Sequence, residues 1–112
     1  MQEYKETLPE VDLSTLSSGS TIEVQTKSRH YRIEYLNGDH VRISGHPQLC
    51  PYPVSARLCG SRKGFDEFSK GHIVRGMQMV FERAGDSVPV TTSEIMEVRV
   101  THDTRSRTSS RG

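Results

Sequence analysis

The sequence has no tryptophan, only two alanines and only two cysteines among its 112 residues. It also has no apolar run close to the roughly 18 residues that a membrane-spanning helix needs. These absences exclude a helical membrane protein, and a chain of this length is expected to form one small domain rather than a multidomain enzyme. Leu, Ile, Val and Phe together number only 24 of the 112 residues, so the core must be small.

The chain is instead rich in residues that favour strands and turns. It contains fifteen Val and Ile residues and nine Gly. β-branched residues favour strands, whereas alanine, the best helix former, is nearly missing. The composition therefore predicts an all-β fold.

Charge divides the chain into three parts. The whole sequence has 15 basic and 14 acidic residues, a net charge of +1, which is not typical of a protein dedicated to duplex nucleic acid. Residues 1–18 are net acidic, and residues 102–112 are net basic with no apolar side chain. We expect 1–18 to be a partly disordered arm, without structure over 1–7 and with one helical turn after Asp12. Residues 19–101 are expected to form the domain, and 102–112 a disordered basic tail.

Alternating apolar and polar residues mark six short strands. Over residues 22–24, 31–35 and 41–43 every second residue is apolar, which is typical of antiparallel strands with one buried face. Further strands are expected over 54–60, 72–83 and 96–101. The inward-facing positions predict a core of Ile22, Val24, Tyr31, Ile33, Tyr35, Val41, Ile43, Leu58, Ile73, Met77, Met79, Phe81, Met96, Val98 and Val100.

The turns constrain how the first three strands pair. A two-residue loop at Ser28-Arg29 keeps the apolar residues of the first two strands on one face. A tight turn at Asn37-Gly38 would instead pair the second and third strands so that the apolar residues of the second strand share a face with Arg42. A shift of one residue in the register moves every side chain of a strand to the opposite face of the sheet. We therefore expect a longer loop of three or five residues, or a bulge, in the second hairpin.

We predict a small antiparallel β-barrel of five to seven short strands with one-turn helices in its loops, because an open sheet would leave edges and a wet face. Two of the helical turns are expected within residues 61–71 and 92–95. Within the strand 72–83, Gly76 is expected to form a bulge that turns Arg75 outward. The alternative architecture is an extended stack of hairpins that serves as half of an obligate dimer.

The chain lacks the common catalytic and nucleotide-binding motifs. It has no GxGxxG, GxSxG, HExxH or Walker loop, so we expect neither enzyme activity nor a cofactor. The candidate metal ligands are His46, Cys50, Cys59 and His72, but the close CxxC pairs of structural zinc sites are missing. Both cysteines are expected to be free thiols, and a small metal-binding protein is the third functional hypothesis.

Basic side chains collect on the polar face of the first two hairpins. Arg29, Arg32, His40 and Arg42 are expected to lie there together, and small barrels bind single-stranded nucleic acid through such faces. The tyrosines of these strands alternate onto the inner face, which removes the platform on which bases would stack. Single-stranded nucleic-acid binding is therefore the alternative hypothesis.

Aromatic residues in the loops favour a protein partner. Tyr52 lies in the proline-rich loop 45–53, and Phe65 and Phe68 lie in the charged loop 61–71; loops on a rigid barrel are frequent binding sites. The first hypothesis is a non-catalytic binding or adaptor module that contacts another macromolecule through these loops, and we expect this partner to be a protein. The acidic start has no apolar segment typical of a secretion signal, so we expect a cytoplasmic location and no membrane association. The oligomeric state stays open.

Overall fold

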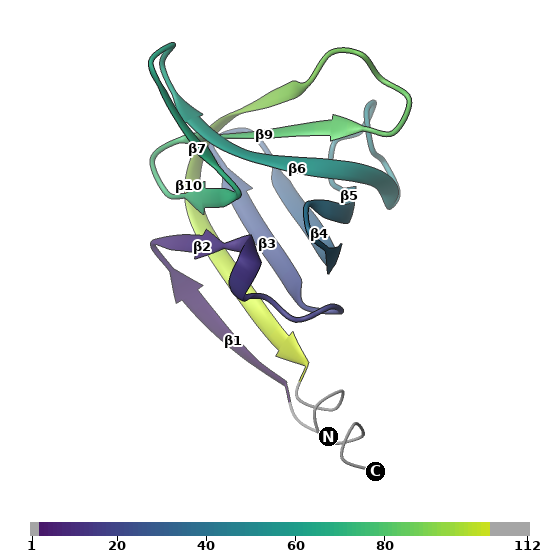
Figure 1. Cartoon of the computed structure of the whole chain (residues 1–112), viewed down its shortest axis with the longest axis vertical. Helices are drawn as coiled ribbons and strands as arrows, with labels where there is room; N and C mark the ends of the chain where they lie inside the picture. The colour runs from purple at the N-terminus through teal and green to yellow at the C-terminus, as the bar shows by residue number, and fades with distance from the viewer. Residues whose placement is uncertain (1–2, 104–112) are drawn as a thin grey trace.

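The computed structural model describes residues 3–103, and this part of the chain is almost entirely β-structure (Figure 1). Residues 1–2 and 104–112 lie outside the described residues, and with them most of the predicted basic tail. No helix between residues 3 and 103 is long and apolar enough to cross a membrane. The described elements are β1 (Glu3–Leu8), β2 (Glu10–Asp12), the 3-10 turn η1 (Leu13–Thr15), β3 (Thr21–Thr26), β4 (His30–Asn37), β5 (His40–Ser44), β6 (Val54–Lys63), β7 (Glu67–Lys70), β8 (His72–Val74), β9 (Gln78–Arg83) and β10 (Val90–Asp103).

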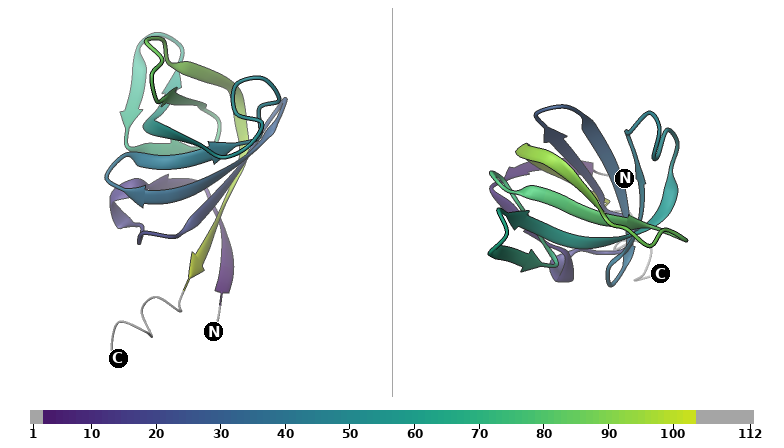
Figure 2. Two further views of the ribbon diagram at one scale, coloured as in Figure 1. Left: turned by 90° about the vertical axis from the view of Figure 1, so that its right-hand side faces the viewer. Right: turned by 90° about the horizontal axis from the view of Figure 1, so that it is seen from above.

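Six strands close into an antiparallel barrel, which confirms the predicted fold class (Figure 2). The order around the barrel is β3, β4, β5, β6, β9 and β10, and β10 pairs with β3 to complete it. Strands that follow one another in the chain are therefore neighbours, except that β7 and β8 are inserted between β6 and β9. β1 pairs along β10, and β7 pairs along β6.

The alternating apolar residues fill the barrel. All the predicted core residues are buried except Met96, and the rings of Tyr31 and Phe81 meet edge-on with centroids 6.0 Å apart. Met96 is 48% exposed because β10 shifts register between Ile95 and Glu97, so that Ile95 turns inward in its place. The core residues that the prediction missed are Val11, Leu13, Cys50, Ala56, Val80 and Ile95.

The hairpin of β3 and β4 pairs its apolar faces as predicted, but its loop is shifted. The N–H of Thr26 donates to the carbonyl of Arg29 at 2.8 Å, which makes Lys27-Ser28 the two-residue loop instead of Ser28-Arg29. The Thr26 hydroxyl also accepts the N–H of Arg29 at 3.0 Å. This side-chain bond favours the earlier turn over the predicted one.

The hairpin of β4 and β5 contains the predicted bulge. Its register shifts between Tyr35 and Asn37, so that the apolar residues of both strands face the core. Gly38 adopts a φ of +57° in the turn, a conformation that glycine takes without strain. The Tyr35 hydroxyl donates to the Gly38 carbonyl at 3.0 Å and ties the turn to the barrel.

Two predicted helical turns are wrong, and one is confirmed. Residues 92–95 belong to β10, where the strand is interrupted by a shift in register rather than by a helix. Residues 61–71 contain the end of β6 and all of β7, which form a hairpin. The turn predicted after Asp12 is present as η1, because the Asp12 carboxylate accepts the N–H of Ser14 at 3.0 Å.

The predicted strand 72–83 is divided into β8 and β9. The chain turns at Arg75 and Gly76, where Gly76 has a φ of +94° and its N–H donates to the Ile95 carbonyl at 2.8 Å. Arg75 is exposed, as expected, although a turn rather than a bulge directs it outward.

The first residues of the chain are paired rather than free, which corrects the prediction of an unstructured arm for residues 3–7. β1 pairs along the final part of β10, and the two extend below the barrel as a ribbon (Figure 1). β2 pairs with β8, and Val11 and Leu13 join the core beside Ile73. The Leu13 N–H donates to the Gly71 carbonyl at 2.9 Å. The early segment therefore packs on the inserted strands.

Candidate partner-binding site

Strand β6 is shared by two neighbours along one edge. β5 pairs with residues 54–57 and β7 with residues 60–63 of that edge, while β9 runs along the opposite one. At the junction the Leu58 N–H donates to the Asp39 carbonyl at 2.8 Å, and the Gly71 N–H donates to the Cys59 carbonyl at 2.9 Å. The sheet therefore splits at Leu58 and Cys59.

A groove of about 440 Å³ lies at this split. Its floor is apolar and includes the buried side chains of Leu13 and Leu58. Tyr35 also lines it, with a hydroxyl already bonded to the β4–β5 turn. The ring of Phe68 forms part of the wall and is 52% exposed. The charged residues around the groove are Asp12, Asp39, Arg57 and Lys70.

On one side of the groove a guanidinium lies between two carboxylates, and another side carries a cation. The Arg57 guanidinium donates to Oδ2 of Asp39 from Nε at 3.2 Å and from Nη2 at 3.1 Å. The Glu82 carboxylate lies 3.7 Å from the same guanidinium. Lys70 has no ion pair with any residue between 3 and 103. The groove therefore offers an apolar surface beside one unpaired positive charge.

Cys59 also lines the groove, and its surroundings disfavour the thiolate form. Burial raises the pKa of its thiol, and the Glu82 and Asp39 carboxylates raise it further against the opposing effect of Arg57. A thiol must ionise to act as a nucleophile or as a metal ligand. Cys59 is therefore suited to packing rather than to catalysis.

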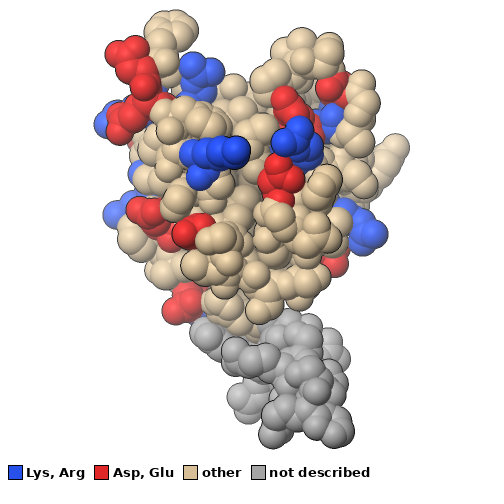
Figure 3. Space-filling view, in the orientation of Figure 1, with Lys and Arg blue, Asp and Glu red and all other residues tan. Residues whose placement is uncertain are grey.

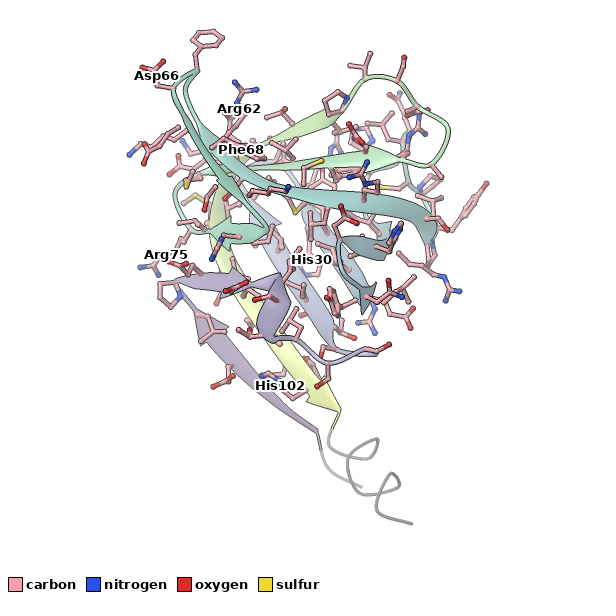
Figure 4. The ribbon with its side chains drawn as sticks, in the orientation of Figure 1. His30, Arg62, Asp66, Phe68, Arg75 and His102 are labelled. Carbon is pink, nitrogen blue, oxygen red and sulfur yellow. The ribbon has the colours of Figure 1, made fainter. Side chains whose placement is uncertain are left out.

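The hairpin of β6 and β7 projects from the barrel and ends in an exposed ring. Lys63 pairs with Glu67, and the three residues between them form the tip. Phe65, the middle residue of the tip, is 97% exposed. Figure 4 shows Asp66 at the end of the hairpin and Phe68 further along it, toward the barrel. The two predicted partner-binding phenylalanines therefore share one element.

The third predicted partner-binding residue does not join them. Tyr52 is 69% exposed in the loop before β6, whereas Phe65 follows the other end of that strand. The loops 45–53 and 61–71 therefore lie at opposite ends of β6. The structure therefore places Phe65 and Phe68 on one hairpin and Tyr52 on a separate loop.

Two arginines of the predicted nucleic-acid face lie beside acidic residues of neighbouring strands. The Arg32 guanidinium lies 3.5 Å from the Glu23 carboxylate, and that of Arg42 lies 3.4 Å from Glu34. His40 lies at the start of β5, 3.8 Å from the Asp39 carboxylate, whereas Arg29 belongs to the β3–β4 loop. Acidic and basic side chains are also interspersed on the face that Figure 3 shows. The structure therefore divides the four predicted residues Arg29, Arg32, His40 and Arg42 and pairs three of them with carboxylates.

The four candidate metal ligands are not gathered into one site. Nδ1 of His46 accepts two backbone N–H groups of its own turn, both at 3.1 Å. Cys50 is buried in the core, Cys59 lines the groove, and His72 faces two carboxylates of β2 at 3.5 and 3.9 Å. Both cysteines are free, as expected. Across residues 3–103, no three or more His, Cys, Asp or Glu side chains are arranged to hold a metal ion.

Sequence reasoning missed the groove beside the two phenylalanines. Its walls come from η1, the β4–β5 turn, the middle of β6 and β7, four segments that are far apart in the chain. Arg57 and Lys70 occupy ordinary polar positions, so no local pattern distinguishes them. No protein-family model, curated protein or solved structure matches this chain.

Proposed function

We propose that this protein is a non-catalytic module that binds another protein, with the β6–β7 hairpin as the element that makes contact. The observation that carries the proposal is the exposure of two phenylalanine rings, Phe65 and Phe68, on one projecting hairpin. Burying such a ring is worth about 1.5–3 kcal/mol. Aromatic side chains placed together on a protruding element are typical of the residues that dominate protein interfaces.

The surroundings of the two rings support a protein partner. Phe68 borders an apolar groove with Lys70 at its edge, and an apolar centre with a polar rim is the usual anatomy of a protein interface. Binding to nucleic acid depends instead on cations that are free to contact phosphates. The arginines of the predicted basic face lie beside Glu23 and Glu34, which favours the protein partner.

A photo-crosslinking amino acid placed at Phe65 in the full chain, in the cells that make the protein, tests this function. We expect a discrete adduct that protease removes and nuclease leaves intact. The same group at Val88, which is exposed in the β9–β10 loop, serves as the control and is expected to give no such adduct. A nuclease-sensitive adduct would instead support the nucleic-acid hypothesis, and equal labelling from both positions would contradict a specific site.

A further inference from the structure

The outer edge of β7 has no partner strand among residues 3–103. The Gly71 N–H donates to the Cys59 carbonyl, and bonded pairs alternate along an antiparallel ladder, so Glu67 and Ser69 direct their backbone groups toward β6. The N–H and carbonyl of Phe68 and the N–H of Lys70 therefore point away from the barrel. An outward row of backbone donors and acceptors can pair with a further strand.

Residues 66–70 are complementary to a second copy of themselves in the antiparallel direction. With a two-fold axis at Phe68, Asp66 of each copy lies opposite Lys70 of the other, and the two Phe68 residues lie side by side. Both charged residues are exposed and have no ion pair elsewhere in the described range. Opposite charges facing each other across a strand pair stabilise it. The edge therefore carries its own matching charges.

The same register brings the hairpin tip next to Gly71 of the second copy. One residue beyond Asp66, Phe65 comes to lie opposite Gly71 of the other copy, and Gly71 lines the groove. The groove, at about 440 Å³, is apolar and open to solvent next to Phe68. The two Phe68 rings, which face each other in this register, therefore lie beside the groove of each copy.

The other edge strand is less suited to such pairing. The described side chains of β1 run from Lys5 to Leu8, and the only apolar one among them, Leu8, is packed against the core. Glu6 is already engaged by His102 at 2.8 Å. The combination of an open edge with an exposed aromatic residue therefore favours β7.

We propose that the protein bound by the hairpin is a second copy of this chain, joined by antiparallel pairing of β7 with β7. The inference rests on the proposed function, because the same hairpin is the binding element in both. Two Asp66–Lys70 contacts fix the register, and the two Phe68 rings meet beside the groove of each copy. The paired edge is short, so the dimer is weak and its population rises with protein concentration.

Charge reversal in the full chain tests this arrangement by sedimentation velocity over a range of concentrations. Asp66→Lys places like positive charges at both contacts, and Lys70→Asp places like negative charges there. Each variant alone is expected to dimerise about tenfold more weakly than the original protein. A one-to-one mixture of the two variants is expected to recover the dimer as a mixed pair, because both of its contacts then join opposite charges.

Lys5→Asp on β1 is the control, since it makes the same change of charge as Lys70→Asp on the other edge strand. We expect it to dimerise like the original protein, and circular dichroism confirms that each variant is folded. The inference is overturned if the protein is monomeric at every concentration, if Lys5→Asp weakens the dimer equally, or if mixing recovers nothing. A monomer that still forms a protein adduct at Phe65 in cells overturns the second copy as partner and leaves the proposed function intact.

Discussion

Gly60 and the carbonyl oxygen of Ser69 lie so close that no side chain fits between them. A Cβ atom at Gly60 would stand 2.2 Å from that oxygen. Gly60 also has a φ of +146°, and it lies where β6 changes its register against β9. Glycine at this position lets β7 pair closely with β6, and this pairing sets the position of Phe68 and of the hairpin tip.

Gly60→Ala is therefore expected to loosen the hairpin. The added methyl group must push β7 away from β6, and we expect a loss of about 1–3 kcal/mol in the free energy of unfolding. Hydrogen exchange at residues 67–70 should become faster, as mass spectrometry can measure. Gly85→Ala is the control, because Gly85 also has a positive φ, +88°, but no atom within 4 Å of the added carbon. Equal effects of the two substitutions would show that the close contact contributes nothing.

The Thr92 hydroxyl is expected to stabilise the join between β9 and β10. This buried hydroxyl accepts the Met79 N–H at 3.0 Å and donates to the Ser93 carbonyl at 2.7 Å. Thr92→Val keeps the shape but leaves the buried N–H without a partner, which costs about 1–3 kcal/mol. Thr92→Ser keeps the hydroxyl and should cost less in the same urea denaturation experiment. A serine variant as unstable as the valine variant would rule out this hydrogen bond as the cause.

His46 is expected to make stability depend on pH. Burial lowers the pKa of its imidazole from the ordinary 6.5, and the positive charges of Arg29 and Arg83 lower it further. Its Nδ1 accepts two backbone N–H groups, which only the neutral ring can do. A folded-state pKa below the unfolded one means that this stabilisation is complete above the ordinary pKa and declines as the pH falls below it.

Urea denaturation at about pH 7.5 and pH 5.5 measures this effect. The original protein should lose stability at the lower pH, and His46→Asn, which keeps an acceptor that does not titrate, should lose less. His30→Asn, at an exposed position of β4, controls for the removal of a histidine. An unchanged pH dependence in His46→Asn would assign the effect to other groups.

The exposed and buried phenylalanines should respond differently to truncation. Phe81 is fully buried against Tyr31, and Phe81→Ala is expected to cost about 3–5 kcal/mol of the free energy of unfolding. Phe65→Ser is expected to change it by less than about 0.5 kcal/mol, because the ring touches almost nothing in the monomer. Thermal denaturation at low concentration measures both. A large loss for Phe65→Ser would show that the tip ring supports the fold rather than a partner.

The barrel was predictable from sequence because its strands have one buried face. Ile22, Ile33 and Ile43 each lie in a segment where every second residue is apolar. A tight turn at Asn37-Gly38 would place the apolar residues of two paired strands on opposite faces, and this mismatch was sufficient to predict the bulge. Met96 was misplaced because the shift of register after Ile95 depends on hydrogen bonds to residues 76 and 77, which no local pattern reveals.

The β6–β7 hairpin could not be predicted from sequence because it lacks the buried face that marks the barrel strands. Residues 62–70 have no buried face along most of their length, so no alternation marks them as strands. In the sequence, only their aromatic residue type distinguishes Phe65 and Phe68 from their neighbours. The groove depends on the split of β6 at Leu58 and on the arrival of η1 from the start of the chain, and both are properties of the tertiary structure.

The size of the protein after chemical crosslinking in its own cells, which retains a weak complex on dilution, tests the central claim most directly. The original chain should elute from a size-exclusion column, detected by antibody, in a species larger than the monomer. The double variant Phe65→Ser/Phe68→Ser should elute as the monomer, with circular dichroism showing that it remains folded. If both proteins elute at the same size, whether monomeric or larger, the hairpin is not the binding surface of this protein.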